Sequence, residues 1–196
     1  MMSDKIRETI VRAASKRMAH YGYSKTSMNE IAADCEMSVG NLYRFYKNKE
    51  AIAVASAHAC LCEKAVQSEV AAEGVGTAFD RLYGYLCARL GFMHKFVSET
   101  PHMHEIVELI STRHQDLLQL YEKRAVDYLA MVLKEGQFKG TVKSGDVESM
   151  AADLYRATMC FNMPMCMYGL LAEKEQQLYS LLKTIFKGLG SQKEEG

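Results

Sequence analysis

The sequence predicts an all-α protein with a small N-terminal helical domain and a larger C-terminal one. Apolar residues recur at i, i+3, i+4 and i+7 along most of the 196 residues, and only two prolines interrupt them. Ser, Thr, Asn or Asp precedes most of these segments, where helix N-caps are expected. We place the first domain at residues 1–50, the second at 51–190 and a flexible tail at 191–196. A linker helix over about 49–69 ends before the two glycines of "AAEGVG", residues 71–76.

The N-terminal part begins with two predicted helices. The first has Asp4 as a candidate N-cap and ends at Gly22. The second begins at Thr26 or Ser27. Because Glu30 stands three residues after Ser27, the pair has the spacing of a capping box.

A turn of three residues, 35–37, joins the second helix to a short third helix that Ser38 caps. Ala32 supplies the small side chain needed where two helices cross closely. Leu42 is the apolar residue of the third helix that faces the core. Two short helices joined by so tight a turn predict a helix-turn-helix.

The segment "VGNLYRFYKNKE", residues 39–50, mixes aromatic rings with cations. A recognition helix places its N-terminal turn in the major groove of DNA while neighbouring groups hold the phosphates. We predict that Phe45 and Tyr46 brace this helix, whereas its hydroxyls and cations contact DNA. The predicted phosphate contacts are Thr26, Ser27, Ser38, Tyr43 and Lys49, and the predicted groove-facing residues are Val39, Gly40, Asn41 and Arg44.

The charge distribution agrees with this interpretation. The formal net charge is zero, yet residues 1–52 hold nine Lys and Arg against six Asp and Glu. A basic end on a mildly acidic remainder is expected when only that end touches phosphate. The alternative is an ordinary helical hairpin with a solvated basic face.

Residues 26–52 resemble the N-terminal DNA-binding signature of the TetR family of one-component transcription regulators. The resemblance implies a homodimer that binds a palindromic operator, with the nine residues above at phosphate-contacting and groove-facing positions. It also implies that a small-molecule effector in the C-terminal part moves the linker helix. This movement changes the distance between the two recognition helices of the dimer, and that distance must equal one turn of DNA, about 34–36 Å. We therefore predict a repressor that a small apolar or amphipathic effector releases. The matching elements are Thr26, Ile31-Ala32, Ser38, Gly40, Leu42-Tyr43, Tyr46 and Asn48-Lys49-Glu50.

The turn of the helix-turn-helix departs from the family pattern. Where the family usually has Ala-Gly-Val, this chain has Cys35, Glu36 and Met37. Glu36 replaces a glycine that commonly takes a left-handed conformation, which costs free energy for an L-residue. It also places an acid near DNA, so we expect it to lower the affinity.

The last two predicted helices carry wide apolar faces. One runs from Asp146 to about Phe161, with Pro164 expected to kink or end it, and the other carries its apolar stripe over residues 178–189. We predict that the two form a four-helix homodimer interface. The alternative is that they complete the core of one subunit.

The segment "MCFNMPMCMYG", residues 159–169, is rich in polarizable side chains, which suit an apolar and variable ligand. We predict that it lines the effector site together with aromatic and Met residues of earlier helices. Ordinary core packing is the alternative for each of them. The predicted lining residues are Phe92, Met93, Phe96, Met103, Tyr121, Tyr128, Cys160, Asn162 and Met163.

Other function classes have weaker support. A metal- or redox-sensing regulator of the same fold would use residues such as His102, His104, Cys160 and Cys166, but positions i and i+2 do not share a helical face. No phosphate-binding loop, nucleophile elbow or zinc-protease motif occurs, so we expect no enzyme, no cofactor and no metal. A helical-bundle binding protein without DNA activity is the remaining option. Without a bilayer-length apolar run or a signal peptide, we expect the protein in the cytoplasm.

Overall fold

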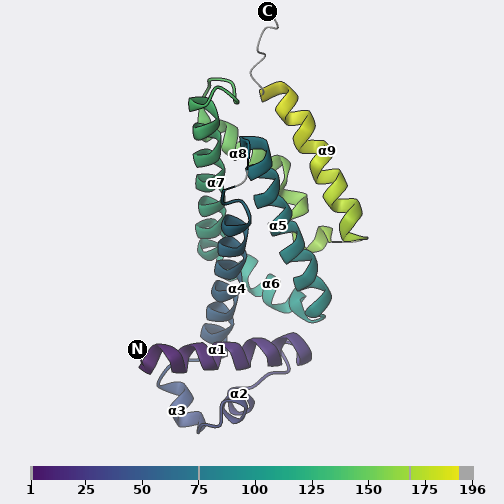
Figure 1. Ribbon diagram of the computed structural model, residues 1–196. Coiled ribbons are helices and arrows are strands. Elements are labelled where there is room, and N and C mark those ends of the chain that lie inside the picture. The colour runs from purple at the N-terminus through teal and green to yellow at the C-terminus, as the bar shows by residue number, and fades with distance from the viewer. Residues whose placement is uncertain (1, 75, 168, 190–196) are drawn as a thin grey trace, which may run out of the picture. The chain divides into compact units, whose positions relative to one another are not determined.

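The computed structural model describes residues 2–74, 76–167 and 169–189, and within these ranges all regular structure is helical (Figure 1). This confirms the all-α prediction. None of the helices in these ranges combines the length and apolarity needed to cross a bilayer. The predicted tail at 191–196 lies outside the described residues. The elements are α1 Met2–Tyr21, α2 Met28–Asp34, α3 Val39–Tyr43, α4 Lys49–Ala71, α5 Ala78–Glu99, α6 Met103–Arg113, α7 Gln115–Phe138, α8 Val147–Ala157, the 3-10 turns η1 Met159–Phe161 and η2 Pro164–Cys166, and α9 Leu171–Leu189.

The chain packs as two compact units, and the division falls inside α4, α5 and α7. Unit 1 comprises Met1–Cys62 and Val97–Gln119, and unit 2 comprises Glu63–Phe96 and Leu120–Gly196. Unit 1 therefore contains α1, α2, α3, the start of α4 and all of α6. The border predicted at residue 50 divides a DNA-binding part from a ligand-binding part, whereas these units are defined by packing. The predicted border therefore stays a prediction.

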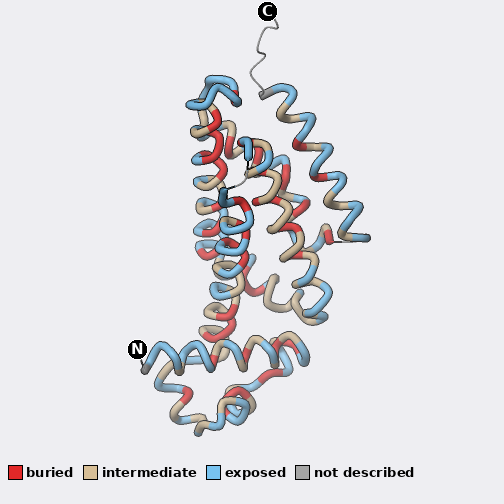
Figure 2. Tube along the Cα trace, in the orientation of Figure 1, coloured by how far each residue is buried: buried red, intermediate tan, exposed pale blue. Residues whose placement is uncertain are grey.

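The core of unit 1 lies between α1, α2 and α3 and also takes in α6 (Figure 2). Ala32 is 2% exposed and Leu42 is fully buried, as predicted for the helix crossing and the core-facing side of α3. Leu109 of α6 joins the same cluster. The buried members are Ile10, Ala14, Met18, Ile31, Ala32, Leu42, Ile52, Ala53 and Leu109.

Side-chain caps set the starts of the short helices in unit 1. Ser27 and Glu30 form the predicted capping box on α2. The Ser38 hydroxyl accepts a hydrogen bond from the Asn41 amide at 3.2 Å, which caps α3. The prediction that Asp4 caps the first helix is wrong: α1 already begins at Met2, and Asp4 lies in its first turn, where a carboxylate favours the positive end of the helix dipole.

Unit 2 is a helical bundle in which α9 packs on α5 through aromatic rings. The Phe79 and Phe186 ring centroids are 5.3 Å apart, as are those of Tyr83 and Tyr179. The main apolar face of α5 is buried here. Its buried residues within unit 2 are Ala78, Leu82, Tyr85, Leu86, Arg89, Leu90 and Met93.

The helix predicted to reach Phe161 ends earlier. α8 stops at Ala157, and the chain continues as η1. The Thr158 amide and hydroxyl both donate to the Leu154 carbonyl, at 3.1 Å and 2.8 Å, and the Phe161 amide then donates to the Thr158 carbonyl in the tighter 3-10 pattern. Pro164 therefore begins η2 rather than ending a long helix.

Candidate nucleic-acid interface

The short helix α3 consists mostly of exposed and half-buried residues (Figure 2). Leu42 is its one buried residue and fixes it to the core of unit 1. Tyr43 is 52% exposed, Ser38 and Arg44 are exposed, and Asn41 is half-buried. Hydroxyl, amide and guanidinium groups thus surround the start and outer face of α3, as a groove-reading helix requires.

Gly40 lies in α3 with open space around it. A Cβ atom built at this position has no heavy atom within 4 Å, and the backbone is not in the left-handed region. The fold therefore does not require glycine here, since another residue would fit and would favour the helix. A glycine at this point leaves room for an external surface to approach the helix backbone, as the sequence predicts for DNA.

Two of the predicted contact residues also hold the fold. Thr26 is 2% exposed, and its hydroxyl donates to the Gly22 carbonyl at 2.8 Å. Val39 is half-buried and packs against the core of unit 1. Thr26 therefore stabilises the turn before α2, and its role at a phosphate stays a prediction.

Lys49 ties the start of α4 to the turn between α1 and α2. Its Nζ donates to the Tyr23 carbonyl at 2.7 Å and lies 4.3 Å from the centroid of the Tyr23 ring. Ser27, which is exposed, donates its hydroxyl to Glu30 at 2.7 Å. Both groups stay near the surface, so each combines a structural bond with a position open to an anion.

Phe45 and Tyr46 pack against the core, which confirms that these rings brace α3. Arg7 of α1 adds a contact that the sequence analysis missed. Its Nη1 donates to the Phe45 carbonyl at 2.7 Å, and its guanidinium lies 5.8 Å and 5.3 Å from the centroids of the Phe45 and Tyr46 rings. A separation of 38 residues leaves no local sequence signal for this contact.

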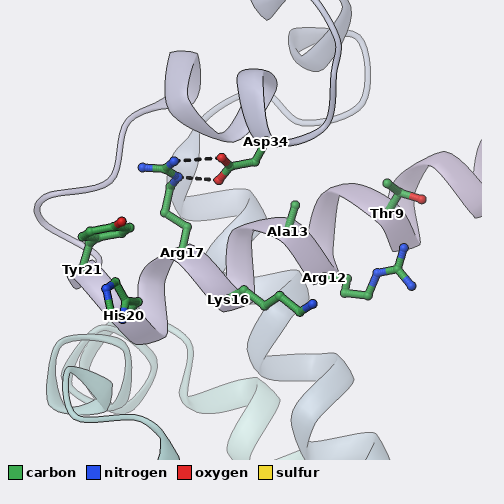
Figure 3. A pocket seen from close by; sticks show the side chains of 8 residues that line it. All are labelled: Thr9, Arg12, Ala13, Lys16, Arg17, His20, Tyr21 and Asp34. Carbon is green, nitrogen blue, oxygen red and sulfur yellow. Dashed lines mark hydrogen bonds and ion pairs between the residues drawn. The ribbon is translucent and has the colours of Figure 1, made fainter.

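A basic pocket of about 470 Å³ lies along α1 and reaches the end of α2 (Figure 3). Arg17 donates from Nη2 to Asp34 at 2.8 Å and lies 3.3 Å from Glu30. The hydrogen bond from Arg17 holds the pKa of Asp34 below its ordinary value of 3.8, and both pairs link α1 to α2. None of the predicted DNA contacts lines this pocket. Its lining residues are Thr9, Arg12, Ala13, Lys16, Arg17, His20, Tyr21 and Asp34.

Glu36 has a backbone φ of +54°, the left-handed conformation predicted for this turn. Its side chain is exposed. The strain of an L-residue in this region is therefore local, and the carboxylate lies in the turn directly before α3.

Three residues of or next to α6 hold the helix-turn-helix by polar contacts. The Ser24 amide donates to Glu105 at 2.6 Å, which lowers the pKa of that carboxyl from 4.5. Glu50 lies 2.9 Å from the His114 ring and 3.4 Å from Arg113, and the His114 bond is the main cause of its lowered pKa. His114 thus faces a carboxylate of α4. α6 therefore contacts both the turn before α2 and the start of α4.

The predicted effector residues come from both packing units. Met103 belongs to unit 1 and the others to unit 2. Cys160 and Met163 are exposed, and the Asn162 side chain accepts from Lys64 at 3.3 Å. None of them lines the basic pocket or a smaller pocket of about 180 Å³ beside Arg81 in unit 2, so the set stays a prediction. In the described ranges, no three His, Cys, Asp or Glu side chains come together to hold a metal ion.

Known proteins share both halves of this architecture. The profile described as "Bacterial regulatory proteins, tetR family" matches residues 10–55, and that described as "Tetracyclin repressor-like, C-terminal domain" matches residues 78–180. An uncharacterized HTH-type transcriptional regulator of Bacillus subtilis, YhgD, is 25% identical over 150 residues, which is 76% of this chain and 78% of that protein.

Solved structures show the same fold. A transcriptional regulator from Cytophaga hutchinsonii has a TM-score of 0.73 at 19% identity and covers 93% of this chain and 97% of its own. A TetR-family regulator from Pectobacterium atrosepticum has a TM-score of 0.69 at 16% identity and covers 96% of each chain. The two profile matches, together with the capped and exposed α3, lead to one conclusion: the chain belongs to the TetR family of DNA-binding transcription regulators and is not an enzyme.

Proposed function

We propose that this regulator is a repressor that binds a palindromic operator as a homodimer and leaves it when a small apolar or amphipathic effector binds unit 2. The observation that carries the DNA-binding part is the capped, exposed α3 with open space at Gly40. Each copy of α3 would enter one major groove, with Asn41 and Arg44 near base edges. Ser38, Tyr43 and Lys49 would hold the flanking phosphates.

The dimer interface is proposed on α8 and α9. Leu178 and Leu182 of α9 are fully buried within the single chain, so part of the apolar stripe completes the subunit core. Leu181 and Ile185 are half-buried, and Tyr179 is 43% exposed. These side chains leave apolar surface on α9 that a second copy can cover.

The contacts of α6 support a route from effector to DNA. Leu109 lies in the core of the helix-turn-helix, and Glu105 and His114 bond Ser24 and Glu50. Any displacement of α6 therefore acts on α2 and α4 together. Because two recognition helices must match a spacing of about 34–36 Å, a small displacement is enough to end operator binding.

DNA binding is tested with a fluorescent duplex from the region beside the protein's own gene, titrated at several salt concentrations. Arg44→Ala is expected to weaken binding by about 1–3 kcal/mol and to relax the preference for one base pair of the operator. Lys134→Ala, an exposed cation of α7 in unit 2, is the matched control and should change neither. Arg44 is a cleaner probe than Lys49, because Lys49 also bonds the Tyr23 carbonyl.

Unchanged affinity and sequence preference in Arg44→Ala would refute the assigned base contact, and no binding of the wild-type protein to any tested duplex would refute the function. The dimer is tested by sedimentation. Ile185→Glu is expected to give a monomer, whereas Lys187→Glu on the exposed side of α9 should remain a dimer. The same oligomeric state in both variants would show that the dimer interface does not include this face of α9.

A further inference from the structure

Arg89 is a buried cation in the middle of α5. The residue is 4% exposed, although Arg is among the residue types least often found inside proteins. Its Nη1 donates to the Tyr85 hydroxyl at 3.3 Å, and its guanidinium lies 5.4 Å from the centroid of the same ring. Both contacts are with Tyr85, a neutral side chain one helical turn earlier.

No Asp or Glu in the described part of the chain forms an ion pair with Arg89. This separates it from other arginines of unit 2, since Arg81 pairs with Glu135 and Arg124 with Glu69. A guanidinium has several N–H donors and stays charged in proteins. Burying such a group without a carboxylate costs stability, so a buried arginine of this kind needs a further role.

Two phenols lie near Arg89, and the charges of Glu69 and Glu122 act on the same phenols without forming an ion pair with Arg89. Besides Tyr85, the half-buried Tyr155 of α8 lies close enough for the Arg89 charge to act on its hydroxyl. Phenol hydroxyls can donate hydrogen bonds to an anion as well as accept them. A carboxylate that reached Arg89 would meet a planar guanidinium, which can bind a carboxylate with two parallel N–H···O bonds, and a phenol hydroxyl beside it.

Arg89 lies within the apolar stripe of α5. Met93 lies four residues later and Phe96 seven residues later, so all three share one face of α5. Met93 is 6% exposed, and Met side chains adapt their shape to different ligands. We propose that the effector is an amphipathic carboxylic acid whose carboxylate binds Arg89 and whose apolar body lies along Met93 and Phe96. This deepens the proposed function, because it names the chemical class of the effector.

The test uses two matched pairs of probes: decanoate with decanol below the micelle concentration, and phenylacetate with phenylethanol. Each pair keeps the apolar body and changes only the charge. At least one acid is expected to raise the thermal midpoint of the wild-type protein more than its alcohol does. Arg89→Met should weaken binding of that acid roughly tenfold to hundredfold, which corresponds to the loss of charge-assisted hydrogen bonds.

A second readout separates ligand binding from a structural role. With no acid present, Arg89→Met is expected to melt at or above the wild-type temperature, because it removes an unpaired buried charge and keeps the side-chain volume. A lower midpoint would show that Arg89 serves the fold and would overturn the inference. Arg89→Lys keeps the charge but loses the planar guanidinium, so it should bind the acid with an affinity between those of the wild type and Arg89→Met. If Arg89→Met does not fold, Arg89→Lys still tests the contact.

The inference also fails if both alcohols stabilise as strongly as the acids, if neither acid stabilises, or if Arg89→Met responds to the acid like the wild type. Operator binding by the wild-type protein is measured separately, without acid. Absence of operator binding overturns the proposed function, whereas the thermal shift still reports acid binding. Operator binding together with no acid-selective stabilisation overturns the effector assignment alone.

Discussion

Replacement of Glu36 by glycine should stabilise the protein. Glu36 has a φ of +54°, where an L-residue costs about 1–2 kcal/mol relative to the right-handed region. Glycine removes this cost but loses about 0.5–1 kcal/mol more conformational entropy on folding. The expected net gain in the free energy of unfolding is therefore about 0.5–1 kcal/mol, or roughly 1–4 °C in the thermal midpoint of a chain of this size. Urea denaturation followed by circular dichroism measures the change directly.

Glu36→Gln is the matched control, because it keeps the backbone strain and removes the charge. Its stability should equal that of the wild type within about 0.5 kcal/mol, the usual range for surface substitutions. Both variants should bind the operator more tightly, since both remove an acid from the turn before α3. A glycine variant no more stable than the glutamine variant would refute the strain argument. Unchanged DNA affinity in both would refute the electrostatic one.

The remaining predictions concern α3 and the acidic residues of unit 1. Gly40→Ala should raise the free energy of unfolding by about 0.5–1 kcal/mol yet weaken operator binding in a mobility-shift assay; unchanged binding would show that nothing approaches this position closely. Tyr43→Phe should leave the thermal midpoint unchanged and weaken binding by about 1 kcal/mol in fluorescence anisotropy, and equal affinity would exclude a role for the hydroxyl. Because the pKa values of Asp34, Glu50 and Glu105 are lowered in the folded protein, the unfolded chain takes up protons first as the pH falls through 3.8–4.5. Stability present above this range should therefore be lost progressively below it, and Glu105→Gln should flatten the decline in urea midpoints measured from pH 6 to pH 3. A wild-type midpoint that stays constant over this range would contradict the argument.

Local sequence signals predicted the helix-turn-helix closely, because short-range chemistry decides it. The Ser27 and Glu30 capping box and the Ser38 cap need partners only three residues away, so spacing is enough to find them. The left-handed backbone at Glu36 followed from the residue that the family usually has in this turn. Asp4 shows the limit of this reasoning, since a good N-cap residue also suits the first turn of a helix.

Long-range contacts could not be predicted in this way. Ser24 and Glu105 are 81 residues apart, and nothing local in either segment indicates the bond between them.

The burial of Arg89 could not be predicted either, for another reason. A helix periodicity places charged residues outside by default, so an arginine inside the apolar stripe of α5 carries no sequence signal. The effector residues are therefore predicted among apolar and Met side chains, and Arg89 of the proposed site is not among them.

The position of Leu109 in the core of unit 1 bears on the construction of hybrid regulators. A chimaera that takes only the segment up to the end of α4 from this protein would lack Leu109, which fills the core of unit 1. It would also lack Glu105, whose carboxylate accepts from the Ser24 amide. The helix-turn-helix of the hybrid protein would then have a cavity at the position of Leu109 and an unpaired Ser24 amide. Grafts that exchange residues 97–119 along with the N-terminal segment keep these partners together and should survive the transfer.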